Sequence, residues 1–122
     1  MKKIGFTGHF NVIDFSFSHK ILLIRNTEIV NEGPFNTDLL FQSTYYLEIP
    51  TRFNGITIER GTLQDCDYLK SKCTSDSIIN IDPARIYILH SEEKKYYIGA
   101  WKLQIITNTY DAGETSIGLK RI

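Results

Sequence analysis

Three histidines carry the side chains best suited to acid–base chemistry in this chain of 122 residues. His9 and His19 are ten positions apart and Lys20 follows the second, so a fold could assemble them into a ribonuclease-like acid, base and cation. His90 lies far along the chain, and none of the three belongs to a metal motif such as HExxH or has a cysteine at ligand spacing. An enzyme centred on His9 or His19 is one hypothesis. The simpler interpretation is that the histidines are polar strand ends.

Other catalytic signatures are missing from the sequence. The eight glycines are scattered singly, so there is no phosphate loop and no dinucleotide fingerprint, and no nucleophile elbow is present. We therefore expect a protein that is not an enzyme and that uses neither a cofactor nor a metal ion.

Paired carboxylates are the second group with possible chemistry. Asp65 and Asp67 lie two positions apart, which on a helix points them to different sides and makes them a poor acid and base pair. Solvated surface explains such pairs most simply. The functional alternative is an acidic patch that attracts lysines and arginines of a basic partner. Two further pairs are Glu92 with Glu93 and Asp111 with Glu114.

Aromatic residues offer a third indication. Four of the seven tyrosines fall on or near the polar phase of their predicted strands, namely Tyr46, Tyr87, Tyr96 and Tyr110. Exposed tyrosines suit a protein interface or a sugar-binding platform, although many simply cover a sheet face.

Charge excludes some partners. Acidic and basic residues balance at 14 each, so no global field draws the chain onto nucleic acid or an anionic membrane. The sequence has neither a signal-peptide pattern nor an apolar run of about 18 residues, and we expect a cytoplasmic protein. Cys66 and Cys73 are then expected to be reduced, small apolar residues on the core side of a helix.

The stretch 38–50 is the strongest structural signal. Its odd positions are apolar except Ser43, and this alternation predicts a strand with one buried face. Its length of about 43 Å at 3.3 Å per residue exceeds that of an ordinary strand, so we expect a bend at 42–44 that lets it serve two sheets.

The remaining elements follow from similar patterns. We expect an opening strand or hairpin at 4–17 and a strand at 19–26, where a buried apolar run suits a central position. A further strand at 56–59 is expected to pair with 38–50 through an Asn54-Gly55 turn. Residues 26–36 are expected to form a surface loop, and 84–107 a hairpin with a charged tip at 91–95. Thr62 with Asp65 forms a capping box that opens the one predicted helix, 62–73. After the helix we expect a linker at 74–77, followed by isoleucines at 78, 79 and 81. A closing strand with Ile117 and Leu119 is expected at the end of the chain.

Together these elements predict a mainly β fold in a single domain, 1–122. The expected architecture is an antiparallel β-sandwich or a partly open barrel of seven to eight strands with one short helix.

The segments HKILLIRN, TDLLFQSTYYLEIPT, GITIERG and YYIGAWKLQI, in a short β-rich chain, resemble the small bacterial immunity proteins of contact-dependent growth inhibition and other polymorphic toxin systems. The resemblance implies a cytoplasmic protein that binds a cognate toxin domain, often a nuclease, and covers its active site. It carries over no binding residue. The residues themselves supply candidates: Asp65, Asp67, Tyr110, Asp111 and Glu114.

The first hypothesis is therefore an inhibitor of a basic toxin domain that acts as a monomer through an acidic and aromatic surface. The alternative is a small-molecule or carbohydrate binding β-barrel without catalysis, with Trp101 and nearby tyrosines in a cavity.

Overall fold

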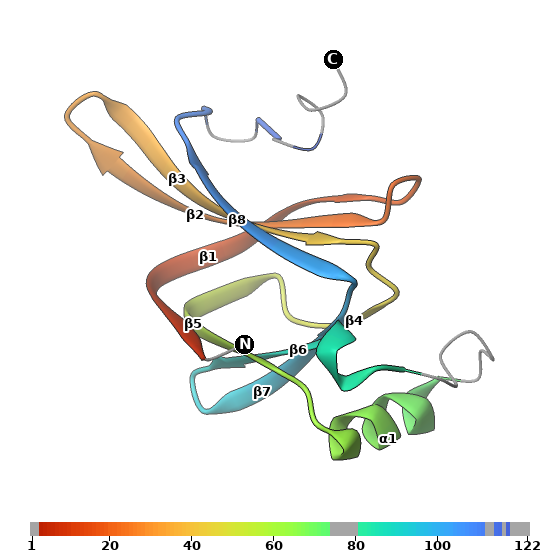
Figure 1. Ribbon diagram of the computed structural model, residues 1–122. Helices are drawn as coiled ribbons and strands as arrows, with labels where there is room; N and C mark the ends of the chain where they lie inside the picture. Colours follow the sequence, from red (N-terminus) through yellow and green to blue (C-terminus); the bar gives the residue numbers. More distant parts are fainter. Residues whose placement is uncertain (1–2, 74–80, 112–113, 116, 118–122) are drawn as a thin grey trace.

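Eight strands form one antiparallel sheet in the computed structural model, which describes residues 3–73, 81–111, 114–115 and 117 (Figure 1). Across the sheet the order is β4-β7-β6-β5-β1-β2-β3-β8, so β4 and β8 are free edges and the sheet is not closed into a barrel. The mainly β class is confirmed, with one α-helix in the described part of the chain. The elements are β1 (Ile4–Ser16), β2 (Ile21–Val30), β3 (Gly33–Gln42), β4 (Tyr46–Glu48), β5 (Arg52–Arg60), α1 (Leu63–Lys72), the 3-10 turn η2 (Pro83–Arg85), β6 (Ile86–Ser91), β7 (Lys94–Gly99) and β8 (Lys102–Asn108).

The sheet curls until strands that are distant in its order meet across the inner face. Phe41 of β3 and Tyr87 of β6 pack edge to face with ring centroids 5.5 Å apart, although β5, β1 and β2 lie between these strands. A flat sheet would hold them about 19 Å apart, at about 4.8 Å per strand. The main core therefore lies inside the curl. Its buried residues are Phe10, Leu22, Ile24, Leu39, Phe41, Phe53, Ile56, Ile58, Tyr87, Leu89, Ile98 and Ala100.

Two smaller clusters cover the outer face. On β6 and β7, Cys66 and Leu69 of α1 pack against the sheet, and on β2 and β3, Leu23 and Leu40 pack against Ile117. The two covering segments lie at opposite ends of the molecule (Figure 1). Strands β2 and β6 are thus buried on both faces, as predicted for the apolar run of β2. The predicted linker 74–77, the isoleucines at 78 and 79, and Leu119 lie outside the described residues.

The stretch 38–50 bends where the sequence predicts. β3 ends at Gln42, Ser43 has a φ of 52°, and β4 begins at Tyr46. β3 lies next to the edge strand β8, whereas β4 forms the opposite edge beside β7. The bend therefore carries one stretch of chain between the two ends of a single sheet rather than between two sheets.

The surface loop predicted at 26–36 is wrong, because β2 and β3 continue through this region as a hairpin. Their polar side chains pair across the strands, with the Thr27 hydroxyl donating to Asn36 Oδ1 at 2.7 Å. The turn is reduced to Asn31 and Glu32. Cross-strand hydrogen bonds satisfy side chains that, in the sequence alone, are typical of a loop.

The Asn54-Gly55 turn is also wrong, and β5 pairs with β1 and β6 rather than with 38–50. Gly55 lies inside β5 with a φ of 73°, and two residues of β1, including Gly8 at a φ of 92°, stand opposite it between the pairs Phe6↔Ile56 and His9↔Asn54. The glycines that suggested a turn therefore form a β-bulge.

The helix begins as predicted. The Thr62 hydroxyl accepts a hydrogen bond from the Asp65 N–H, and the Asp65 carboxylate accepts one from the Thr62 N–H at 2.8 Å, which completes the capping box. Asp65 is buried rather than solvated, and Leu63 is 75% exposed.

The predicted strand 96–107 is divided into β7 and β8. The tip of the hairpin is also shorter than expected, since Lys94 and Lys95 belong to β7.

A buried polar network holds the segment after β8 against the sheet. Arg25 and Asp38, opposite each other on β2 and β3, form a two-pronged ion pair with distances of 2.7 and 3.0 Å, and their side chains are 1% and 0% exposed. Asn108 donates to Asp38 at 2.7 Å, and the Arg25 guanidinium donates to the Glu114 carbonyl oxygen. Because every charge is hydrogen-bonded, the cost of burying the pair is offset.

Replacing Asp38 by Ala is expected to lower the free energy of unfolding by about 3–5 kcal/mol, since it leaves the Arg25 charge buried without its partner. The double variant Arg25→Met, Asp38→Leu is expected to be more stable than the single variant, because it removes both charges. Urea unfolding measures both. A loss below about 1 kcal/mol for Asp38→Ala would contradict the account of this network.

Candidate functional site

The structure does not place His9, His19 and Lys20 close enough to form the hypothesised catalytic site. His9 lies within β1 opposite Asn54, whereas His19 lies in the turn beyond β1, where its Nδ1 is 2.9 Å from the Ser18 hydroxyl. The strand between His9 and Ser16 spans about 23 Å at 3.3 Å per residue. Lys20 lies over the Phe17 ring, with its Nζ 5.3 Å from the ring centroid. Acid, base and cation therefore do not converge on one point.

The predicted carboxylates of α1 have different environments. Asp67 is exposed, whereas Asp65 caps the helix and accepts a hydrogen bond from Lys95 of β7 at 3.1 Å. Burial alone would raise the pKa of the Asp65 carboxyl, but hydrogen bonds from the Thr62 N–H and from Lys95 outweigh it and leave the pKa below its ordinary value of 3.8. Asp65 therefore fastens α1 to the sheet, and of the two only Asp67 is free to meet a partner.

Next to Asp65 lies a small hollow with a second close polar contact. His90 Nε2 is 2.7 Å from Glu59 Oε2, and both residues line a hollow of about 180 Å³ together with Lys95. Burial would lower the pKa of Lys95, but its hydrogen bond to Asp65 outweighs this and raises the pKa above 10.5. The polar side chains in this hollow thus largely contact one another.

Tyr110, Asp111 and Glu114 lie at the other end of the molecule, on the segment after β8. Asn36 Nδ2 donates to the Tyr110 carbonyl at 2.9 Å, and the Arg25 guanidinium carbon lies 5.9 Å from the Tyr110 ring centroid. The Asp111 N–H donates to Glu114 Oε1 at 2.8 Å, which holds the two exposed acidic residues next to each other. The structure therefore keeps these three predicted residues together but separates them from α1 (Figure 1).

The β2–β3 hairpin adds residues that the sequence interpretation missed. Glu28 and Glu32 are exposed, and beside them lie three exposed apolar side chains, Ile29 at 81%, Val30 at 47% and Phe35 at 40%. Because Asn36 binds Tyr110, the hairpin and the segment after β8 are neighbours. Strand alternation places Ile29 on the same side of the hairpin as Asn36, and Glu28, Val30 and Phe35 on the other side. We name this end of the molecule the acidic hairpin end: Glu28, Ile29, Val30, Glu32, Phe35, Tyr110, Asp111 and Glu114.

Charge in the acidic hairpin end has one sign. The sequence contains no lysine or arginine from 26 to 51 or from 103 to 119, and Arg25 is buried in its ion pair with Asp38. Lys120 and Arg121 lie outside the described residues. This gap in basic residues was visible in the sequence and is the signal that could have identified the hairpin.

The aromatic predictions have mixed outcomes. Tyr46, Tyr96 and Tyr110 are half-buried, but Tyr87 is fully buried, because its side chain lies in the core inside the curl of the sheet. Trp101, expected inside a cavity, is 57% exposed and lies against the Arg85 guanidinium, whose carbon is 4.5 Å from the ring centroid. The cavity proposed around Trp101 is therefore wrong.

Within the described residues, no group of three or more His, Cys, Asp or Glu side chains is placed to hold a metal ion. In the same part of the chain, no helix is long and apolar enough to cross a membrane. No protein-family model matches the chain, and neither does any curated protein or solved structure with which it was compared.

Replacing Asp65 by Asn is expected to lower the free energy of unfolding by roughly 1 kcal/mol at pH 7. Because the Asp65 carboxyl pKa is lowered in the folded state, Asp65 stabilises the fold above pH 3.8, and this stabilisation is lost as the pH falls through the folded-state pKa. Because the Lys95 pKa is raised, the stabilisation from Lys95 is fully present at every pH below 10.5 and therefore does not change over the acidic range. The difference from the parent protein should therefore shrink below pH 3.8. Urea unfolding from pH 2 to 7, with Asp67→Asn as the control, tests this; a difference that is constant with pH would contradict it.

Proposed function

We propose that this chain binds and neutralises a cognate toxin domain, as small bacterial immunity proteins do, and that the acidic hairpin end is its binding surface. The observation that carries the proposal is the combination of exposed carboxylates and exposed apolar side chains on one end of the molecule, in sequence segments without any lysine or arginine. The proposed setting is the cytoplasm, and the proposed role requires no catalysis and no cofactor.

Charge favours a nuclease as the toxin. A nuclease domain must present a basic surface to bind the phosphates of its substrate. Glu28, Glu32, Asp111 and Glu114 offer negative charges that such a surface would attract, and complementary charge gives fast association and rejects acidic partners. The inhibitor would then cover the active site by occupying the place of the nucleic acid.

The exposed apolar side chains supply what charge alone does not. Ile29 is 81% exposed, a large fraction for an isoleucine, and Val30 and Phe35 are close to half exposed. Desolvated apolar and aromatic anchors commonly carry most of the affinity of an interface, with charged residues around them. Tyr110, held beside the hairpin, adds an aromatic anchor next to Asp111 and Glu114.

Rigidity supports the proposal further. The β2–β3 hairpin is paired along its length, and the Arg25–Asp38 network fixes the segment after β8 against it. A surface that is ordered before binding loses less conformational entropy when the partner docks. This favours tight binding, expected to be on the order of nanomolar or tighter.

Reversing two charges of the acidic hairpin end tests the proposal. Tagged parent protein, recovered from cells of its source, is expected to retain one stoichiometric basic partner with toxin activity. The double variant Glu28→Lys, Glu32→Lys is expected to lower the association rate constant for this partner at least about tenfold, because like charges then face each other. Mass spectrometry identifies the partner, and surface plasmon resonance at low and high salt measures the rates.

The matched control is Asp67→Lys, an exposed charge reversal on α1, which should leave binding unchanged. If this control loses the partner and the hairpin variant retains it, the binding surface lies on α1 and the assignment of the acidic hairpin end is wrong. If no partner is recovered, or if the partner is not a toxin, the immunity function is wrong.

A further inference from the structure

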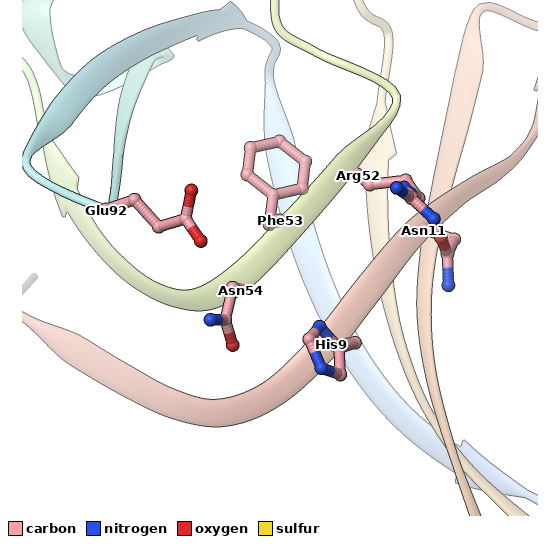
Figure 2. A pocket seen from close by; sticks show the side chains of 6 residues that line it. All are labelled: His9, Asn11, Arg52, Phe53, Asn54 and Glu92. Carbon is pink, nitrogen blue, oxygen red and sulfur yellow. The ribbon is translucent and has the colours of Figure 1, made fainter.

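A pocket of about 390 Å³ opens where β1, β5 and the β6–β7 turn meet (Figure 2). Arg52 and Asn11 lie side by side at one end of it in Figure 2, and Glu92 lies at the other end, beyond Phe53. A pocket of this volume accepts a small molecule. Its lining residues are His9, Asn11, Arg52, Phe53, Asn54 and Glu92.

The backbone around the pocket fixes these side chains. His9 is opposite Asn54 and Asn11 is opposite Arg52 in the pairing of β1 with β5, on either side of the pair Phe10↔Phe53. Four polar side chains therefore come from two cross-strand pairs that share one face of the sheet. The bulge formed at Gly8 and Gly55 directly adjoins His9 and Asn54. Bulges of this kind redirect side chains and are common beside binding sites.

The backbone of Glu92 is also held in place. It has a φ of 51° and Glu93 has a φ of 66°, in a tight hairpin turn that favours Asn-Gly rather than two glutamates. The Ser91 hydroxyl donates to the Asn54 carbonyl at 3.3 Å, which ties this turn to β5. The turn thus directs a carboxylate toward a pocket lined by polar side chains of β1 and β5.

The two charges of the pocket have no partner within the described residues. Neither Arg52 nor Glu92 makes an ion pair or a side-chain hydrogen bond there, and neither do the side chains of His9, Asn11 and Asn54. Arg52 and Glu92 are exposed to solvent, whereas the buried charges Arg25 and Asp38 are paired with each other. A guanidinium and a carboxylate that share a pocket without touching leave room for a ligand between them.

We propose that this pocket binds a zwitterion of about the size of a dipeptide. Its carboxylate lies against Arg52 and Asn11, where a guanidinium offers two parallel donors, and its ammonium group lies against Glu92. Asn54 and His9 are placed to bind the peptide group between the two ends. A simple anion would be repelled by Glu92 and a simple cation by Arg52, whereas a zwitterion pairs with both.

This binding site does not depend on the proposed toxin partner. The acidic hairpin end is formed by β2, β3 and the segment after β8, while the pocket is formed by β1, β5 and the β6–β7 turn. Either assignment can fail without the other.

Titration of the full-length ¹⁵N-labelled protein with three related probes tests the proposal. Alanyl-alanine is expected to shift the amide resonances of His9, Asn54 and Glu92 and to saturate. Its N-acetyl form, which lacks the cation, and its amide form, which lacks the anion, should each bind at least about tenfold more weakly.

Two variants of the β6–β7 turn give a matched comparison. In Glu92→Gln, alanyl-alanine and its N-acetyl form should bind equally, because the partner of the ammonium group is gone, whereas Glu93→Gln should behave as the parent protein. Superimposable spectra of the free variants confirm that both remain folded. The proposal is overturned if all three probes bind alike, if none saturates at millimolar concentration, or if the two variants lose affinity equally.

Discussion

The Arg25–Asp38 ion pair is the contact on which the acidic hairpin end depends. Both charges are buried on the outer face of β2 and β3, and they are tolerable there only because the segment after β8 covers them and supplies further hydrogen bonds. The same contacts place Tyr110, Asp111 and Glu114 next to the hairpin. One buried polar network therefore explains why Asn36 and Tyr110, which are 74 positions apart, lie next to each other at one end of the molecule.

The sequence predicted the fold correctly where the deciding interactions are between residues close together in the chain. The capping box needs only Thr62 and Asp65, three residues apart, and the bend at Ser43 follows from a lapse in alternation. The sequence predictions were wrong where contacts between residues far apart in the chain determine the secondary structure or the burial. Asn36 belongs to a strand because it bonds to Thr27 and to Asn108, and the second of these is 72 positions away. Tyr87 is buried because the curl of the sheet brings Phe41 of β3 against the inner face of β6, which no alternation pattern in β6 itself reveals.

The candidate site was predictable in part for the same reason. Tyr110, Asp111 and Glu114 were identified by type and spacing, but their neighbours Glu28 and Glu32 fell in a region taken for a loop. Asp65 was expected to face solvent as a candidate for partner binding. Instead its carboxylate caps α1 and accepts a hydrogen bond from Lys95, so it stabilises the fold. The pocket at Arg52 and Glu92 depends on strand register and on a bulge, and the glycines that form this bulge indicated a turn in the sequence.

Hydrogen–deuterium exchange on the complex recovered from source cells locates the bound surface without any substitution. If the acidic hairpin end binds the toxin, exchange slows on binding in peptides that cover the β2–β3 turn and in those that contain Tyr110 and Asp111, and it is unchanged in α1. Protection of α1, with the hairpin and the segment after β8 unaffected, would contradict it.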